Sequence, residues 1–297
     1  MTEIKKLLLL PHIKVQNANA LSSPFTIGFP AMTAWLGAAR ALQRKLNQQK
    51  MEDIKFNSVA VISHHFDLQT HKGVGDYVHS IIGTGNPLEK DGKRSAFIED
   101  ARCHLDVSIL IEFSGIDKDD EEILLETVEH IMNTQLKIAG GDILKFKSPE
   151  CLRVEDGNNK DLAILNRKLM PGYTLIERRE LIVDAMQQGQ DAIDAILDYL
   201  KITHHCEQDE NENITWTSHR KTTGWIVPIA TGFHGITELG VAKNQRDSNT
   251  PHRFAESVVT LGEFVMPYRI KSLDDMLWHY HTDLDNNLYL CRQNNQI

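Results

Sequence analysis

Histidine is the residue whose number and spacing in this chain most readily suggest chemistry. The sequence contains 14 histidines, and several stand close together, as in His64-His65, His204-His205 and His279-His281. A zinc site needs side chains that converge on one point, whereas neighbouring residues of a strand point to opposite faces of the sheet. No His-Glu-x-x-His segment is present. We therefore expect no metal site and no other cofactor.

Nucleophilic and nucleotide-hydrolysing chemistry finds little support. The four cysteines are widely spaced and form no Cys-x-x-Cys pair, as expected of a reduced cytoplasmic protein. The chain has no Gly-x-Ser-x-Gly segment, and residues 83–87 lack the ending of a phosphate-binding loop. No apolar run approaches the roughly 18 residues of a membrane span. A metal-independent ribonuclease stays open, because it needs only a base such as His64 or His65, an acid and phosphate-binding cations.

A segment of short polar side chains could bind nucleic acid after the first predicted strand. Its candidate RNA-binding residues are Gln16, Asn17, Asn19, Ser22 and Ser23. Amides donate to and accept from base edges, and hydroxyls reach phosphates. In an ordinary turn, the same groups would instead bond the local backbone. Basic side chains beside predicted loops or strand ends could bind phosphate or stack on bases, or else pair with neighbouring acids. These are Lys93, Arg94, Arg102, Arg178 and Arg253.

The formal net charge of −9 argues against a general nucleic-acid binder. The charge is unevenly distributed, however. Residues 117–129 hold seven acids and one lysine, and residues 205–215 hold four acids, whereas residues 1–48 hold six basic residues against Glu3 alone. This asymmetry is typical of a protein with one surface for an anionic partner and acidic faces elsewhere.

Hydrophobic spacing predicts the elements that must position these side chains. Strict alternation over 103–113 indicates a strand with one buried face. Apolar residues at spacings of three and four predict helices over 32–46 and along Leu124–Ile138. Further strands are expected over 4–15, 58–68, 143–147, 172–183 and 224–230, and further helices around 193–200 and 273–280.

The first half therefore has the order β-α-β-β-α-β with a break in the middle. This order is typical of a ferredoxin-like, RRM-like core in an α+β protein, with both helices on one face of an antiparallel sheet. The central strands offer only Phe66 and Phe113, and they lack the stacking aromatics of an RNA-recognition sheet. If nucleic acid binds, we expect loops and the insertion to bind it.

The break near 70–101 contains five glycines and Pro87, and it predicts a long inserted hairpin, which we call the thumb. Its apolar candidates for contacts are Tyr77, Ile81 and Ile82. We expect residues 1–148 to form the ferredoxin-like core with its thumb. Residues 149–297 are expected to form an α+β C-terminal region packed on that core.

A family resemblance runs over nearly the whole chain. The longer matching segments are LLLLPHIKVQNANALSSPFTIGFPA (7–31), ARCHLDVSILI (101–111), LMPGYTLIERREL (169–181), GWIVPIATGFHGI (224–236) and TPHRFAESVVTLGEF (250–264). The shorter ones are ALQRK (41–45), GNPL (85–88), IAGGDIL (138–144) and DDMLWHYH (274–281). In these segments the chain resembles the Csy subunits of type I-F CRISPR surveillance complexes that cap the 5′ handle of the guide RNA. That family is a Cas-five-type branch of the RAMP superfamily.

The resemblance implies a function without catalysis. Such a subunit binds the 5′ handle of the CRISPR RNA, pairs with the large subunit of the Csy complex and abuts its repeated backbone subunit. It meets target DNA only indirectly, through the complex, in antiviral defence, and it involves no membrane. The thumb would lie between the second and third strands of a ferredoxin-like core. Two alternatives remain: a CRISPR-RNA-processing endoribonuclease of the same superfamily, and a scaffold that touches only protein.

Overall fold

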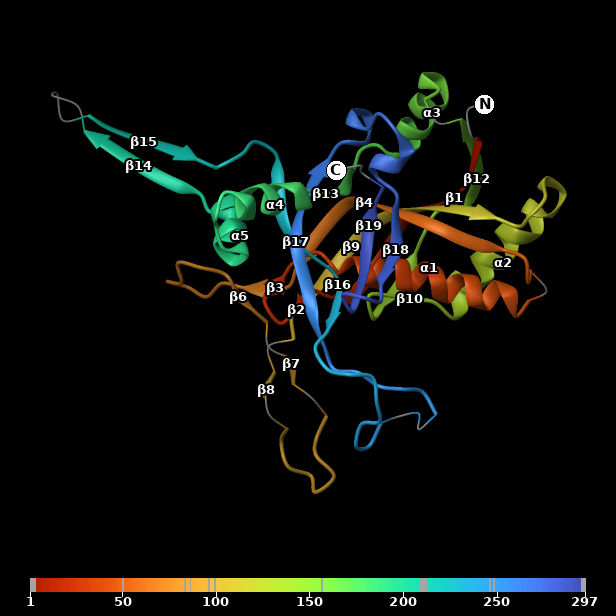
Figure 1. Cartoon of the computed structure of the whole chain (residues 1–297), viewed down its shortest axis with the longest axis horizontal. Helices are drawn as coiled ribbons and strands as arrows, with labels where there is room; N and C mark the ends of the chain where they lie inside the picture. The colour runs from red at the N-terminus through yellow and green to blue at the C-terminus, as the bar shows by residue number, and fades with distance from the viewer. Residues whose placement is uncertain are drawn as a thin grey trace.

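The computed structural model describes residues 4–49, 51–82, 84–85, 87–95, 97–98, 100–155, 157–208, 213–245, 247 and 249–294. Its dominant feature is an 11-stranded antiparallel sheet with a few helices packed on it (Figure 1). The predicted α+β class is confirmed. No helix in the described ranges is long and apolar enough to cross a membrane.

The first part of the chain contains two long helices and the longest strands. Its elements are β1 (Ile4–Asn19), β2 (Leu21–Ser23), β3 (Thr26–Ile27), α1 (Met32–Asn47), β4 (Lys55–Leu68), β5 (Thr70–His71), β6 (Ser80–Ile81), β7 (Thr84–Gly85), β8 (Phe97–Ile98), β9 (Arg102–Ser114), the 3-10 turn η1 (Lys118–Asp120), α2 (Glu121–Thr134), β10 (Lys137–Ile138) and β11 (Gly141–Lys145).

The second part begins with a strand that returns to β1. Its elements are β12 (Glu150–Glu155), α3 (Asn159–Leu169), β13 (Tyr173–Glu177), α4 (Arg179–Gln187), α5 (Ala192–Leu200), β14 (Thr203–Gln208), β15 (Ile214–His219), β16 (Trp225–Gly235), β17 (Ala255–Val265), the 3-10 turns η2 (Pro267–Arg269) and η3 (Leu273–Asp275), β18 (Trp278–Asp283) and β19 (Leu288–Gln293). The predicted division at residue 148 falls between β11 and β12, both of which pair with β1, and it stays a prediction.

Helices α1 and α2 cover one face of the strands β11-β1-β9-β4, which are neighbours in that order. Alternation decides which side chains face them. Leu105, Val107 and Ile109 of β9 are buried in one cluster with Trp35 of α1 and Val128 of α2, because every second residue of a strand points to the same side. The other face of these strands is called the outer face below.

One end of the outer face is also buried, which explains why the middle of β1 is apolar on both sides. Leu7 and Leu9 of β1 pack in a second cluster with Leu165 of α3 and Leu273 of η3. Beyond that cluster, from His12 onward, the exposed residues of β1 are polar or charged. The outer face is therefore open to solvent where β1 approaches the polar segment 16–23.

The C-terminal strands continue the sheet and return to it. β4 pairs with β13, and the path β13-β17-β16-β19-β18 leads back to β4, where Trp278 is the register partner of Val59. The Trp278 ring is fully buried, and its indole N–H donates to the Leu175 carbonyl at 2.9 Å. The first and second parts of the chain thus share one sheet.

Three expected elements are wrong. The helix expected up to Ile138 ends at Thr134, and Ile138 lies in β10. The strand expected over 172–183 ends at Glu177 and is followed by α4. The helix expected over 273–280 is a single 3-10 turn followed by β18, because Leu273 and its neighbours pack as a turn against β1.

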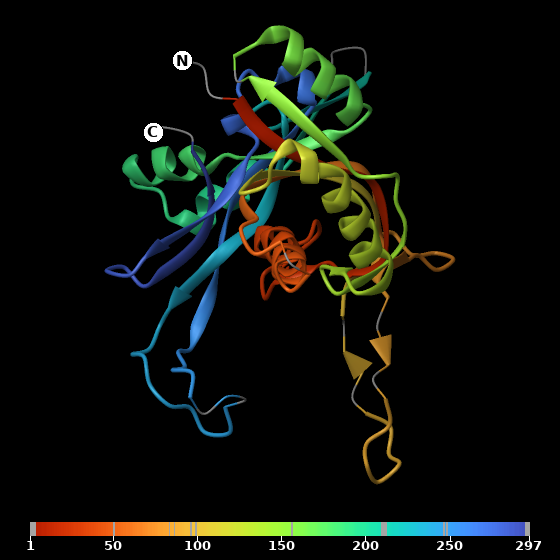
Figure 2. The same ribbon diagram turned by 90° about the vertical axis from the view of Figure 1, so that its right-hand side faces the viewer.

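The insertion after β4 forms two hairpins rather than one. β5 pairs with β6, and β7 pairs with β8. Figure 2 shows the β7–β8 hairpin extending far from the sheet, and the connection between β16 and β17 extends in the same direction. Ile81 packs partly against the core, so it anchors the first hairpin. Residues 83, 86, 96 and 99 of the insertion lie outside the described residues.

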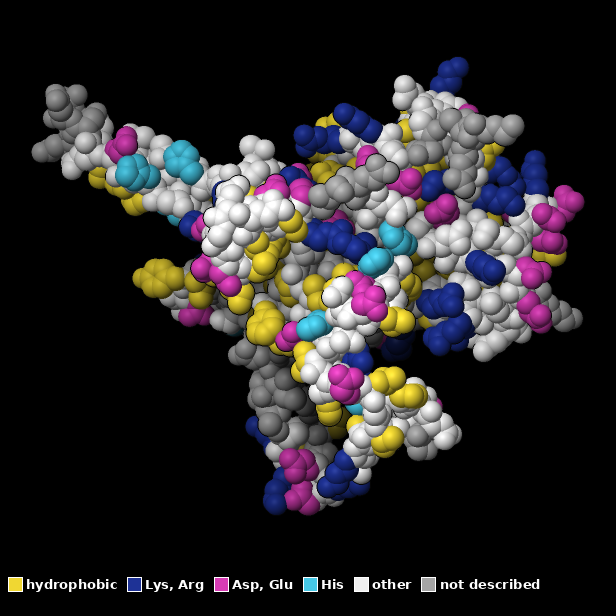
Figure 3. Space-filling view, viewed as in Figure 1, with side chains coloured by type: hydrophobic (Ala, Val, Ile, Leu, Met, Phe, Trp, Pro, Cys, Tyr) yellow, Lys and Arg dark blue, Asp and Glu magenta, His cyan; other side chains and the backbone are white. Residues whose placement is uncertain are grey.

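A further hairpin projects from the molecule in another direction than β7–β8 (Figure 1). The β14–β15 hairpin follows α5 and extends away from the sheet, with every described residue of both strands exposed (Figure 1). Figure 3 shows hydrophobic side chains on this hairpin and at the tip of β5–β6. Three acids of the 205–215 stretch, Asp209, Glu210 and Glu212, lie outside the described residues.

Candidate nucleic-acid interface

Asn17 is the point at which the ends of three strands meet. The pairing of β1 with β9 shifts register between Val15 and Ala18, and Asn17 in this bulge has a positive φ of 55°, which asparagine tolerates better than most residues. The Asn17 side-chain oxygen accepts a hydrogen bond of 2.6 Å from the Gln69 amide. The Asn17 backbone N–H donates to Nδ1 of His104 at 3.3 Å. The bulge therefore turns Asn17 toward β4 and β9.

Arg102 adds a cation to this cluster. It is the register partner of Asn19 at the start of β9, and its guanidinium donates to the backbone oxygen of Asn17 at 3.5 Å. A second guanidinium nitrogen pairs with Asp100. The side chain is one-third exposed, so hydrogen-bonding capacity remains on the solvent side. Asn17, Gln69, His104 and Arg102 are called the strand-end cluster below.

A hollow of about 650 Å³ lies beside the strand-end cluster. Asn19, Ser22 and Arg102 line it together with Lys137 and the first turn of α1. That turn holds no acidic residue, and its N-cap, Ala31, makes no side-chain cap, so the free N–H groups of the helix end have no side-chain acceptor. Asp100 also lines the hollow and pairs with Arg102, and Lys137 pairs with Asp142 at 2.7 Å, so an anion bound beside the helix end would compete with these carboxylates for the two cations. The structure thus brings three of the sequence-predicted residues to one hollow.

Local hydrogen bonds occupy the side chains beyond Asn17. The Asn19 amide both donates to the Leu21 carbonyl, at 3.0 Å, and accepts from the Leu21 N–H, at 3.1 Å. The hydroxyls of Ser22 and Ser23 lie 2.8 and 2.7 Å from that of Thr26, and Ser23 is only 5% exposed. These contacts are those of a turn. Gln16, Asn17 and Asn19 are all exposed, but the side chain of Asn19 is held by its own turn.

Arg178 and Arg253 lie on other elements. The Arg178 guanidinium pairs with Glu180 and Glu263 and lines a different hollow, of about 620 Å³, beside β13 and β17. Arg253 precedes β17 and donates to the Asn287 side chain. The structure does not bring either arginine to the strand-end cluster, and both have the ion-pair or hydrogen-bond partners expected of structural residues.

The remaining candidates lie in the insertion. Lys93 pairs with Asp91 at 2.7 Å, and Arg94 is exposed beside it. Tyr77 is 97% exposed in the β5–β6 hairpin, and Ile82 is also exposed, whereas Ile81 packs against the core. Their roles in binding stay predictions.

His64, one of the two histidines expected as a possible base, is held on both sides. Nδ1 of His64 lies 2.5 Å from the Pro171 carbonyl oxygen, and Nε2 lies 2.7 Å from the Ser108 hydroxyl. The His64 ring also stacks on His12, with ring centroids 4.1 Å apart. Burial lowers the pKa of His64, and nearby positive charge at His12 and Lys147 acts in the same direction. Neither ring nitrogen is free to take a substrate proton in this arrangement.

The buried and half-buried cysteines are poorly suited to nucleophilic chemistry. Burial raises the pKa of Cys103, Cys151 and Cys291 to about 12, which keeps these thiols protonated and poorly nucleophilic. Within the described ranges, no group of three or more His, Cys, Asp or Glu side chains is arranged to hold a metal ion.

Sequence reasoning missed Gln69 and His104. His104 lies on the polar side of the alternating 103–113 pattern, and Gln69 directly follows β4. Both are ordinary positions, and nothing in their spacing marks them. They join the site because the bulge at Asn17 brings the three strand ends together, and this contact depends on register.

Comparisons with known proteins identify the family of this chain. Residues 8–291 match the family model described as CRISPR-associated protein (Cas_Csy2). The chain is also 34% identical over 317 residues to the CRISPR-associated protein Csy2 of Pseudomonas aeruginosa (strain UCBPP-PA14), in an alignment that covers 97% of this chain and 95% of that protein.

Proposed function

The chain belongs to the Csy2 family of CRISPR-associated proteins and is thereby a subunit of the type I-F Csy complex; from this premise, we propose that it is the non-catalytic subunit that binds the 5′ handle of the CRISPR RNA. The observation that carries the proposal is the strand-end cluster. Asn17 and Gln69 offer amides that bond base edges in both directions, and Arg102 offers a guanidinium for phosphate or base.

The hollow beside the cluster supports the same assignment. Unpaired bases of single-stranded RNA are splayed out and held by hydrogen bonds and stacking rather than read in a groove. A hollow of about 650 Å³ lined by Asn19, Ser22 and Arg102 has room for such a base or its phosphate. The turn that Asn19, Ser22 and Ser23 stabilise would hold the walls of this hollow in place.

We also propose that the chain has the ferredoxin-like core of a Cas-five-type RAMP protein. The support is the strand order β11-β1-β9-β4, with α1 between β1 and β4 and α2 between β9 and β11. The insertion then lies between the second and third strands of that core, where a thumb is expected.

The proposed partners are the large subunit of the complex and the repeated backbone subunit, with target DNA met through the complex in the cytoplasm. Exposed hydrophobic side chains on the thumb support a protein or RNA contact there. Val74, Tyr77 and Val78 of the first hairpin are among the most exposed large hydrophobic residues of the described chain, and such groups commonly mark interaction sites.

The experiment is co-expression with the large subunit and a guide RNA, followed by isolation of a stoichiometric complex. We expect a guide with its cognate 5′ handle to be retained and one with a permuted handle to be lost. Arg102→Gln should reduce retention, and Arg167→Gln, which removes the same charge at an exposed position on α3, serves as a matched control for the strand-end cluster. Equal retention of both guides would refute handle binding.

A cleavage assay separates the ribonuclease alternative. Purified protein is incubated with labelled repeat RNA in the presence of a chelator, and intact RNA is expected. Specific cleavage that disappears in a His64→Ala, His65→Ala variant would instead establish the endoribonuclease. Crosslinks from the assembled complex to handle nucleotides would exclude the protein-only scaffold.

A further inference from the structure

Three lysines gather on the open part of the outer face. Lys14 lies between Ile13 and Val15, which are buried under the helices, so its side chain points to the outer face. Lys145 of β11 is its direct register partner and therefore shares that side. Lys147 lies two residues beyond the end of β11 and is exposed, and its backbone N–H donates to the Pro11 carbonyl at 3.0 Å, which holds it beside the same stretch of β1. Lys14, Lys145 and Lys147 are called the lysine track.

The track is poorly neutralised within the protein. Like charges directly opposite in an antiparallel pair destabilise a sheet, yet Lys14 and Lys145 are opposite each other. Asp106 is the nearby acid, 3.9 Å from Nζ of Lys14, and it is shared with His12 at 3.2 Å. In the part of the chain that the structure describes, neither Lys145 nor Lys147 forms an ion pair.

Lysines elsewhere on the same strand are paired. Nζ of Lys5 lies 2.7 Å from Asp274 and 3.5 Å from Glu112, and Lys6 donates to the Ile116 carbonyl at 2.7 Å. The lysines without a full ion-pair partner therefore lie at the end of β1 that approaches the strand-end cluster. An anionic ligand bound there would reduce the repulsion between Lys14 and Lys145.

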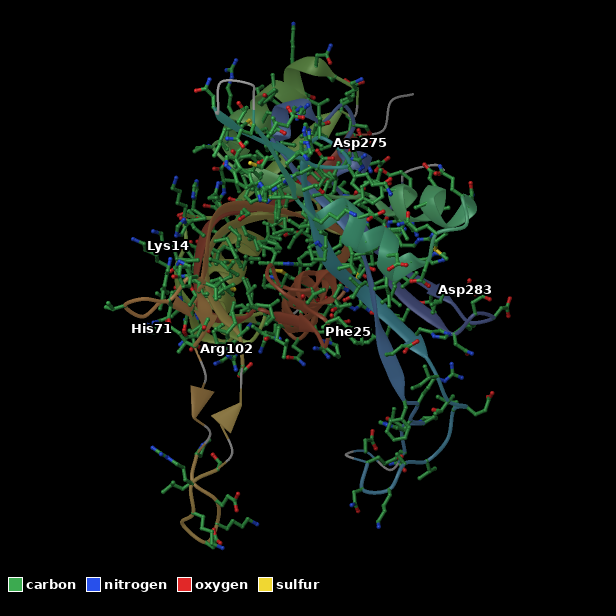
Figure 4. All side chains as sticks on the ribbon, turned by 90° about the vertical axis from the view of Figure 1, so that its left-hand side faces the viewer. Lys14, Phe25, His71, Arg102, Asp275 and Asp283 are labelled. Carbon is green, nitrogen blue, oxygen red and sulfur yellow. The ribbon has the colours of Figure 1, made fainter. Side chains whose placement is uncertain are left out.

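The track and the strand-end cluster lie on one surface. Figure 4 shows Lys14, His71 and Arg102 along the same outer side of the curved sheet, with Phe25 toward α1. Lys14 is five residues from Asn19, the register partner of Arg102, which at about 3.3 Å per residue corresponds to roughly 16 Å along the strand. A single nucleic-acid strand can therefore contact both.

We propose that the lysine track binds the sugar–phosphate backbone of the guide RNA next to the handle nucleotides. This inference rests on the proposed function and extends it, since it assigns a second, sequence-independent binding site to the outer face. Lysine binds phosphate as a point charge without reading bases. The strand-end cluster then supplies selectivity, and the track supplies affinity that depends on salt.

The test uses the full chain and fluorescein-labelled RNA in anisotropy titrations between 50 and 200 mM salt. The probes are a cognate handle followed by oligouridine, and the same RNA with the handle sequence permuted. The variant is Lys14→Gln, Lys145→Gln, Lys147→Gln. The control is Lys55→Gln, Lys118→Gln, Lys160→Gln, which removes the same charge at other exposed lysines. Matched thermal midpoints verify that both variants are folded.

We expect the track variant to flatten the slope of log affinity against log salt by about 2, at about 0.7 for each phosphate contact on a single strand. The loss should be equal for cognate and permuted handles, and the control should keep the parent slope. Equal binding of the two handles by the parent protein would refute handle recognition while leaving the track result intact. An unchanged slope in the track variant overturns the track, as does an equal flattening of the slope in the control variant.

Discussion

The side-chain oxygen of Asn17 accepts a 2.6 Å hydrogen bond from the amide of Gln69, and this contact joins the bulge of β1 to the end of β4, directly before the thumb. The two residues are 52 positions apart in the sequence. The amide nitrogen of Gln69 also lies 3.1 Å from Nε2 of His104. A displacement of any one of these three strand ends would therefore alter the side-chain contacts of the other two. The strand-end cluster and the base of the thumb are therefore one structural unit.

Asn17 gives the first prediction. Asn17→Gly removes the side chain but keeps a residue that adopts positive φ easily, so it tests the amide without straining the bulge. We expect handle affinity to fall by about 1–3 kcal/mol, the range for a well-placed contact to a base edge. Titration with cognate and permuted handles measures this loss. Asn19→Ala is the comparison, because Asn19 bonds its own turn; a larger loss of selectivity from that change would contradict the assignment.

Arg178 gives a prediction about stability rather than binding. Its guanidinium pairs with Glu263, whose side chain is almost buried, and is itself only 24% exposed. Arg178→Ala leaves that carboxylate without its cation, so we expect unfolding free energy to fall by about 2 kcal/mol, within the usual cost of an unsatisfied buried group. Denaturant unfolding measures it. Unchanged stability combined with weaker handle binding would return Arg178 to the RNA site that the sequence suggested.

His64 predicts a dependence of stability on pH. Burial lowers its pKa below the ordinary value of 6.5, so the unfolded chain binds a proton more readily than the folded one. Stability should therefore be fully present above pH 6.5 and fall as the pH drops toward the folded-state pKa. Asp106 opposes this fall, while His12 and Lys147 reinforce it.

The measurement is the free energy of unfolding between pH 7.5 and 5 for the parent and for His64→Gln. Burial also lowers the pKa of His279. Because both proteins contain His279, only the difference between their pH profiles reports His64. We expect the variant to lose less stability than the parent over this interval. Parallel pH profiles would show that His64 does not titrate differently in the two states.

The elements predicted best are those with one simple apolar face. Residues 103–113 alternate with Leu110 as the one apolar residue in the polar set, and the structure has β9 at Arg102–Ser114. The spacing of Leu273, Met276 and Leu277 resembles a helix, but Ser272 and Asp275 form a capping box on a single 3-10 turn. All three apolar residues are buried there in the cluster on the outer face. Short apolar spacing cannot distinguish these two outcomes, because both bury the same side chains.

The site was harder to predict than the strands that carry it. Alternation correctly identifies the core-facing residues of β9, but Ser108 and Leu110 on the other side are also fully buried, so the expected single buried face is wrong in the middle of the strand. The polar segment after β1 was found from composition. The position of Asn17 depends on a register shift in β1, and a bulge leaves no mark in hydrophobic period. The partners Gln69 and His104 follow from that shift, so they could be identified only once the strands were paired.

The thumb gives the last prediction. Val74, Tyr77 and Val78 are exposed and lie in the β5–β6 connection, whereas Ile81 packs on the core. Replacing 72–79 by Asn-Gly, which suits a two-residue hairpin turn, should leave the thermal midpoint nearly unchanged, because the removed side chains bury little surface. Ile81→Ala is the matched control and should lower the midpoint by several degrees.

The shortened protein should still bind the handle but recruit the backbone subunit poorly, as measured by the stoichiometry of that subunit in the co-expressed complex. Full recruitment by the shortened protein would mean that this hairpin does not contact the backbone subunit, and a large drop in its thermal midpoint would mean that 72–79 belongs to the core.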